Sequence, residues 1–402
     1  MPFASRPERS LRLLSLAALL SALAACGGGG SDQPDAAAAD SVDAVGAEST
    51  DPALTDVADE PVRDVQALGT VISNAGTPPA GYAGGALVPA AARAAAITTP
   101  TTVIGNGTPA SCTSEAVVSA VAKGGVITFR CGAQPVKIYM TATAKVFNNK
   151  PDVVLDGGGL VTLSGQKKLR VLYQNTCDQK QVWTSSRCDL QDSPKLTVQN
   201  ITFVDGNSAG QTYGRTDVEG GGAIFVRGGR LKVVNARFFR NECQATGAAK
   251  GGALRATGMS AAAPVYIVGS SFGGATGFGN HCSAGGAISG LAASFSLYNT
   301  LMSHNEVTGG PTTGGGGGGG AIAQDGNTMD LSIVGSYLHD NKASEGGGAI
   351  FYTSNNRTGT MSITNSVLHA NLSVKYETAA LPGIFVQAKP GQPVITGSTI
   401  TK

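Results

Sequence analysis

Aromatic residues and long apolar segments are scarce in this 402-residue chain. Aromatic side chains make up only 5% of it, whereas 57 residues are glycine. This composition is typical of many short strands and turns rather than of a helical globule. After the first 26 residues, no segment is apolar for long enough to span a bilayer. The seven glycines at 314–320 are followed neither by Lys with Ser or Thr nor by a predicted helix, which excludes a phosphate-binding loop.

The first 26 residues have the features of an export signal. Three arginines precede an apolar run that is too short for a transmembrane helix and ends in LAAC. This tetrapeptide resembles the bacterial lipoprotein box, in which the cysteine is lipidated and becomes the mature N-terminus. We therefore expect a signal peptide over 1–25, lipidation at Cys26, and sorting to the outer membrane because Gly27 rather than Asp follows. Ordinary secretion with an incidental cysteine is the alternative.

Residues 26–100 have the composition of a disordered acidic tether. Between Ser31 and Asp64 there are ten acidic residues and a single base, Arg63. Such a segment buries too little apolar surface to offset its ordering entropy, so we expect it to hold the folded part away from the membrane.

The folded part is basic once these segments are set aside. From residue 65 onward there are 25 Lys and Arg against 16 Asp and Glu, a net charge near +9. This charge favours polyanionic partners such as acidic polysaccharide over neutral ones. Charges spread over solvated faces are the alternative. We expect no nucleic-acid partner.

The folded part is expected over residues 101–402, and from Leu196 to Lys402 it repeats one pattern of short strands. Each repeat has a strand, a pivot, a second strand, an asparagine, a variable loop and the letters GGA with Ile or Leu. The pivots, which are only Asn or Gly and therefore indicate a left-handed bend, are Asn200, Asn235, Gly269, Asn299, Gly335, Asn365 and Gly397. The second asparagines are Asn207, Asn241, Asn280, Asn305, Asn341 and Asn371. The GGA elements begin at Gly221, Gly251, Gly285, Gly319 and Gly347, and Pro382 starts a degenerate sixth.

These repeats predict an all-β fold, a right-handed parallel β-helix in which coil stacks upon coil. An antiparallel sandwich would need hairpin turns every 8 to 12 residues and would not explain columns of identical residues. A short helix over 113–123, with Thr113 or Ser114 as N-cap, is expected to cap the first coil. Six cysteines in an exported chain favour disulfides, and register pairs Cys243 with Cys282 in neighbouring coils. We expect the other two bonds to be Cys177 with Cys188 and Cys112 with Cys131.

The paired motifs GGA[IL] and FFRN, MSHN, LHDN or LHAN resemble those of chlamydial polymorphic outer-membrane proteins and of pectin-lyase-like β-helix surface proteins. The start of the folded part, CTSEAVVSAVAKGGVITFRCG, is similar to the N-terminal cap of the same class. The resemblance covers roughly 110–402 and implies the fold rather than a function. The polymorphic proteins continue into a membrane barrel, whereas this chain stops at GSTITK inside a coil. We therefore expect an open last coil or a partner that covers it.

In this class the substrate groove usually runs along the strand that here begins with GGA. Alternation turns two rows of that face outward: Phe225, Arg255, Ser289, Ala323 and Phe351, then Arg227, Thr257, Leu291, Asp325 and Thr353. The residues expected to bind substrate, through aromatic rings, two arginines and one carboxylate, are Phe225, Arg227, Arg255, Asp325 and Phe351. A mixed solvent face without a ligand is the alternative.

Catalytic residues cannot be assigned from a family. The face lacks the acidic calcium ligands of pectate lyases and the aspartate cluster of polygalacturonases, because it carries only Asp325. The weak candidates are therefore Arg255 and Asp325 on this face, and His304 with Asp340. The four histidines, each within two residues of a second asparagine, are His281, His304, His339 and His369.

Two histidine columns follow from the repeat. His339 shares a column with His369, and His304 shares one with Arg240 and Asp340. An imidazole and a carboxylate of neighbouring coils can do acid and base work, and stacked histidines can hold a metal, but exposed turn positions also tolerate polar residues. We name no metal ligands and no cofactor.

The sequence therefore predicts an outer-membrane lipoprotein that presents a β-helix for binding or adhesion to polysaccharide or a host surface ligand. A polysaccharide lyase or glycoside hydrolase acting along the GGA strands is the alternative.

Overall fold

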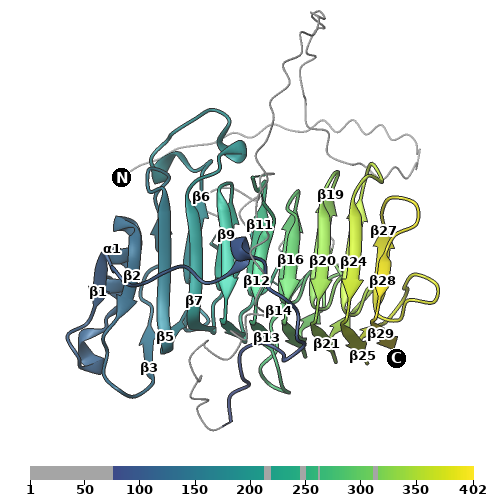
Figure 1. The fold of residues 1–402 in the computed structure, drawn as a ribbon, viewed down its shortest axis with the longest axis horizontal. Helices are drawn as coiled ribbons and strands as arrows, with labels where there is room; N and C mark the ends of the chain where they lie inside the picture. Colours follow the sequence, from purple (N-terminus) through teal and green to yellow (C-terminus); the bar gives the residue numbers. More distant parts are fainter. Residues whose placement is uncertain (1–75, 212–218, 245–249, 261–262, 311–315) are drawn as a thin grey trace, which may run out of the picture. The chain divides into compact units, whose positions relative to one another are not determined.

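The computed structural model describes residues 76–211, 219–244, 250–260, 263–310 and 316–402. All of them belong to one compact unit, Val62–Lys402. Short parallel strands stack side by side along one axis and form a parallel β-helix, which confirms the expected fold (Figure 1). The predicted signal peptide, Cys26 and most of the predicted tether lie outside the described residues. None of the described helices is long and apolar enough to cross a membrane.

The described strands form three parallel sheets. The 17-stranded sheet contains β1 (Thr102–Ile104), β2 (Gly125–Phe129), β3 (Val136–Tyr139), β5 (Asp152–Ser164), β7 (Lys195–Val204), β9 (Arg230–Val234), β10 (Arg237–Phe239), β12 (Val265–Val268), β13 (Ser271–Gly273), β16 (Phe295–Tyr298), β17 (Leu301–Ser303), β20 (Asp330–Val334), β21 (Tyr337–His339), β24 (Thr360–Thr364), β25 (Val367–His369), β28 (Val394–Thr396) and β29 (Thr399–Thr401). The 8-stranded GGA sheet contains β4 (Ala144–Val146), β6 (Leu172–Asn175), β8 (Ile224–Arg227), β11 (Leu254–Thr257), β15 (Ile288–Leu291), β19 (Ile322–Gly326), β23 (Ile350–Ser354) and β27 (Ile384–Gln387). The 4-stranded sheet contains β14 (His281–Cys282), β18 (Glu306–Val307), β22 (Lys342–Ala343) and β26 (Leu372–Ser373).

The bends between strands lie where the sequence placed them. All seven pivots have a left-handed backbone, with φ between 46° and 58°. The first glycine of each of the five GGA elements is also left-handed. The second glycine is needed because a Cβ on Gly320 would lie 2.0 Å from the carbonyl oxygen of Gly348 in the next coil. Gly319 and Gly320 therefore belong to an ordered element, whereas 311–315 lie outside the described residues.

The core consists of columns of apolar side chains. The Ile or Leu that follows each GGA points inward and is buried from β8 to β27, as expected. On the opposite sheet, the rings of Phe203, Phe238 and Phe272 stack in neighbouring coils with centroids 5.2 and 4.4 Å apart. Repeated burial of the same column is what holds the coils in register.

A ladder of buried asparagine side chains runs along one corner. The Nδ2 of Asn305 donates to Oδ1 of Asn341 at 2.9 Å, and the same bond links every neighbouring pair from Asn241 to Asn371. Asn207 is not part of this ladder, which corrects our assignment. Register places Gly206 beside Asn241, and the backbone N–H of Gly206 donates to Asn241 Oδ1 at 2.9 Å.

The predicted cap and disulfides are present. The helix α1 (Ser114–Lys123) begins at Thr113, whose hydroxyl accepts a backbone N–H of the first turn, and ends at Gly124 with φ 77°. Val117 and Val121 are fully buried in the same core as the first coils. The disulfides join Cys112 with Cys131, Cys177 with Cys188, and Cys243 with Cys282, so all three predicted pairings are confirmed. Short 3-10 helices lie at η1 (Ala90–Ala92), η2 (Pro109–Ser111), η3 (Gln179–Gln181) and η4 (Cys188–Leu190).

Residues 76–100 pack along the β-helix, so a tether that extends to residue 100 is wrong. Ala86 exchanges two hydrogen bonds with the side chain of the pivot Asn299, at 2.8 and 2.9 Å. Ala95 exchanges two with the Gln199 side chain, at 2.8 and 3.0 Å. Ala92 is fully buried beside Val234 and Val268. This segment has no acidic residue, and its small side chains allow the close approach that the acidic segment before it would resist.

Candidate functional site

The outward rows of the GGA sheet have the predicted register. Phe225 pairs with Arg255, Arg255 with Ser289, Ser289 with Ala323, and Ala323 with Phe351. The second row contains Arg227, Thr257, Leu291, Asp325 and Thr353.

Phe225 does not offer the exposed ring that we expected for a sugar. It is fully buried, with the Tyr173 ring stacked at 5.5 Å and the Arg170 guanidinium 5.0 Å from its centroid. Tyr173 belongs to β6 of the preceding coil and covers the row at this end. Arg227, two residues further along β8, is half-buried. Strand β8 therefore presents little open aromatic surface.

Aromatic rings gather instead at the other end of the row. Phe351 is half-buried and stacks on Phe385 of β27 with centroids 4.7 Å apart. Tyr376 meets the edge of Phe385 at 5.3 Å. Rings in this arrangement supply apolar surface of the kind that sugar rings pack against.

A small pocket of about 110 Å³ lies beside Phe351 and contains Lys250 and Asp325. The Lys250 Nζ lies 4.0 Å from Asp325 Oδ2. Burial lowers the pKa of Lys250, Arg255 lowers it further, and Asp325 opposes the change. Arg255 itself is 6% exposed and donates to the Ser289 hydroxyl at 3.3 Å.

The structure therefore brings Arg255, Asp325 and Phe351 together around a lysine that the sequence analysis missed. The sequence did distinguish Lys250. The residue before GG is Gly in three of the other GGA elements and Ala in the fourth, so Lys250 is the one charged residue at this position.

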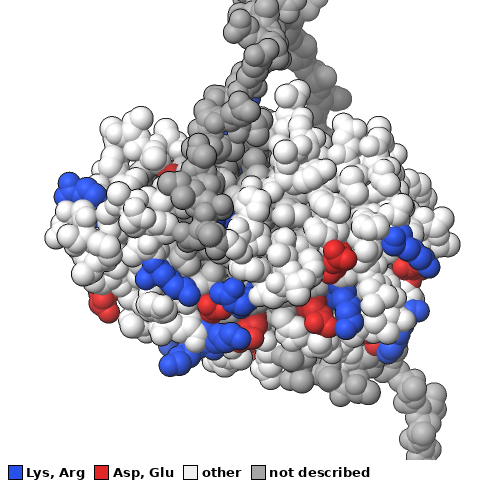
Figure 2. Space-filling model, turned by 90° about the horizontal axis from the view of Figure 1, so that it is seen from below, with Lys and Arg blue, Asp and Glu red and all other residues white. Residues whose placement is uncertain are grey.

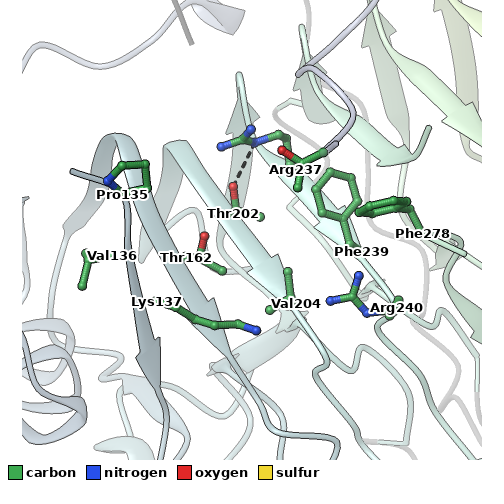
Figure 3. A pocket seen from close by; sticks show the side chains of 11 residues that line it. Pro135, Val136, Lys137, Thr162, Thr202, Val204, Arg237, Phe239, Arg240 and Phe278 are labelled. Carbon is green, nitrogen blue, oxygen red and sulfur yellow. Dashed lines mark hydrogen bonds between the residues drawn. The ribbon is translucent and has the colours of Figure 1, made fainter. Parts of the chain in front are cut away.

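A larger pocket, of about 230 Å³, lies on the outer face of β3, β5, β7 and β10 (Figure 3). Its floor is one register row in which Lys137, Thr162, Thr202 and Arg237 follow one another across four strands. Lys137 and Arg237 thus lie three strands apart, about 14 Å at a strand spacing of about 4.8 Å. Figure 3 shows the two threonines between these cations.

Arg240 and two aromatic rings form the other wall of this pocket. Phe239 and Phe278 meet edge to face at 5.1 Å, and the Arg240 guanidinium lies 5.6 Å from the Phe278 centroid. Asp205 pairs with Arg240 at 2.8 Å and approaches Lys137 at 3.9 Å. One carboxylate therefore serves two of the three cations.

Arg237 is the unusual member of the pocket. It is 7% exposed, its Nε donates to the Thr202 hydroxyl at 2.9 Å, and its Nη2 reaches the Gly159 carbonyl oxygen at 3.5 Å. Burial lowers the pKa of Arg237, yet a guanidinium remains charged in proteins. No carboxylate pairs with it among the residues that the structure describes. A buried cation without an anionic partner is unfavourable until an anion arrives.

The remaining predicted candidates form a separate group at the corner next to the asparagine ladder. His304 and Asp340 occupy one column on neighbouring coils, and His339 and His369 occupy another, as predicted. His304, His339 and Asp340 come together, whereas His281 and His369 bind the hydroxyls of Thr308 and Thr401. The four weak catalytic candidates therefore split between two sites, since Arg255 and Asp325 lie on the GGA sheet.

Charge is not gathered in one large basic patch on the face shown in Figure 2. Lys and Arg there lie next to Asp and Glu. The net charge alone therefore does not mark an anion-binding surface on this face. Specific contacts such as those of Arg237 then matter more for an anionic ligand than the net charge does.

No protein-family model, curated protein or solved structure matches this chain. The resemblance to polymorphic and pectin-lyase-like proteins is thus supported only to the level of a parallel β-helix.

Proposed function

We propose that this protein binds acidic polysaccharide along the outer face of its β-helix. The observation that carries the proposal is Arg237, a buried guanidinium without a carboxylate partner that lines the larger pocket. A carboxylate or sulfate group on a sugar would complete its hydrogen bonding through a charge-assisted pair.

A chain of sugars fits this surface better than a single small anion. The cations Lys137 and Arg237 are spread along one row, and the half-buried Thr162 between them offers a hydroxyl that can bond a sugar hydroxyl. The half-buried Phe278 ring adds apolar surface beside the row. A polymer with repeated negative charge would contact both cations at once. Its affinity would rise because the second contact forms within the same complex.

Binding is tested with the full chain and a panel of polyuronates and sulfated polysaccharides, with neutral dextran as reference. Arg237→Thr gives the row the residue type that its neighbours already have, and should weaken binding about ten- to hundredfold. Arg130→Thr removes the same charge from an exposed position outside the pocket and should change binding little. Equal losses in both variants, or equal binding of dextran, would reject the proposal.

A polysaccharide lyase is the second candidate, and the lowered pKa of Lys250 favours it. A neutral amine at Lys250 would take the C5 proton of a uronate whose carboxylate pairs with Arg255. The C–H electron pair becomes the C4–C5 double bond as the C4–O bond breaks, and the leaving oxygen takes a proton from solvent. Ultraviolet absorbance of an unsaturated product, lost in Lys250→Met, would support this reaction. New reducing ends without that absorbance would indicate a glycoside hydrolase instead.

We further propose that the chain is an outer-membrane lipoprotein anchored through Cys26, with an adhesive role at the cell surface. The LAAC tetrapeptide and the acidic segment after it support the anchor. Cys26→Ser should release the protein from the membrane fraction into the soluble fraction. The last coil, in which Val394 is 49% exposed, is the proposed place for a covering partner.

A further inference from the structure

Three side chains with metal-binding atoms meet at the corner beyond β17 and β21. His304 follows β17, and His339 and Asp340 stand at the end of β21 in the next coil. One ligand atom of each lies within 4.8 Å of the other two. The imidazole rings of His304 and His339 meet edge to face, with centroids 5.8 Å apart.

The backbone under this group is fixed on both sides. His304 and Asp340 have left-handed conformations, with φ 57° and 52°, directly before the ladder residues Asn305 and Asn341. The 2.9 Å bond between those two asparagines locks the neighbouring coils together. Donors from the two coils are therefore held at a set separation before any ligand binds.

Hydrogen bonds and stacking also orient the rings. His304 Nδ1 lies 3.0 Å from the Ser303 hydroxyl, which leaves Nε2 for another partner. His339 stacks on Tyr337 at 4.2 Å, and its Nδ1 lies 2.7 Å from Asp340 Oδ2. Orientation of an imidazole ligand by a hydrogen bond to its other ring nitrogen, as at His304, is typical of metal centres.

Small residues stand on both sides of the group in its column. Gly279 precedes Asn280, one coil before His304, and Ala370 precedes Asn371, one coil after Asp340. Lys342, two residues beyond Asp340, is paired with Glu306 at 2.9 Å. The side chains of His339 and Asp340 are 17% and 47% exposed, so an ion can enter from solvent.

We propose that His304, His339 and Asp340 bind one divalent transition-metal ion of the zinc type, with water completing its coordination. Two imidazole nitrogens and one carboxylate suit zinc, copper or nickel, whereas calcium and magnesium prefer sites made of oxygen atoms. The ion would join two neighbouring coils at the corner, the three ligands are not among the residues that line the anion pocket, and the site does not depend on polysaccharide binding.

Titration calorimetry of the full chain with zinc chloride tests the site. The expected result is one ion per chain, with affinity lowered by at least about tenfold in His304→Asn and in His339→Ser. Asparagine tolerates the left-handed backbone of His304, and serine already occupies the row of His339 at Ser303, so both variants keep the local fold. His281→Ala is the matched control, because His281 lies outside the group and should leave affinity unchanged.

Thermal unfolding supplies an independent reading, since an ion that binds only the folded state raises the midpoint. Zinc should raise it in the parent and in His281→Ala but not in the double variant His304→Asn with His339→Ser. Magnesium should have no effect on any of them. Absence of zinc binding by the parent, unchanged affinity in the double variant, or an equal loss in His281→Ala would each overturn the proposal.

Discussion

An asparagine of the ladder, such as Asn305, should contribute far more to stability than Asn207, which has the same place in the sequence motif but lies outside the ladder. The Asn305 side chain is fully buried and makes four hydrogen bonds. Its Nδ2 donates to the Phe272 carbonyl and to Asn341 Oδ1, both at 2.9 Å, while its Oδ1 accepts from the backbone N–H and the Nδ2 of Asn280 at 3.0 and 2.9 Å. At about 1 kcal/mol for each bond, Asn305→Ala should lower the free energy of unfolding by about 4 kcal/mol.

Asn207→Ala is the matched control for this prediction. Asn207 is half-buried, and its contacts to Lys167, Glu242 and Ala209 are largely solvent-accessible, so water can replace them. We expect a loss below about 1 kcal/mol. Urea unfolding followed by far-ultraviolet circular dichroism gives both values, provided that the m-values agree. Equal losses in the two variants would refute the assignment of the stabilisation to the ladder.

Three further results are expected. Gly320→Ala should prevent close stacking of neighbouring coils and lower the melting midpoint. Gly310→Ala should not lower it, because a Cβ there would meet only one side-chain atom, at 3.4 Å. Equal midpoints in the two variants would contradict this. Burial lowers the pKa of Lys250 in the folded chain. Between the folded and unfolded pKa values the unfolded chain therefore binds more protons, and the free energy of unfolding rises with pH. Lys250→Met should reduce that rise, as measured by urea titrations at neutral to alkaline pH. Replacing Cys243 and Cys282 by Ser, which opens a loop of 39 residues, should cost about 4 kcal/mol by the chain-entropy relation, and a parent-like urea midpoint would argue against it.

The sequence predicted the columns because each column is restricted by backbone geometry. A pivot such as Asn235 needs a left-handed residue, and the residue before Ala223 must lack a Cβ. Where two neighbouring residues both suit the same position in the repeat, the prediction was wrong. Gly206 and Asn207 both suit the ladder corner, and only the register of the neighbouring coil decides that Gly206 stands beside Asn241.

The burial of a side chain was harder to predict than the face of the strand on which it lies. Strand alternation correctly turned Phe225 away from the core, but it carries no information about Tyr173 and Arg170, which cover Phe225 from outside the repeats that we counted. The packed segment before residue 100 was missed for a related reason. Its contacts pair Ala86 with Asn299, more than 200 residues away, and no local pattern encodes such a pairing.

The residues that we propose to bind anions differ in chemistry from their neighbours in the same column. Stacking favours similar residues at matching positions of successive coils, so a charged side chain between small or short polar ones is a candidate for ligand binding. Arg237 stands between Thr202 and Ser271 in its register row, and Lys250 is the one charged residue among the small residues before GG. Returning Arg237 to threonine should therefore leave the coil intact and remove the anion contact, which separates ligand binding from folding at a single position.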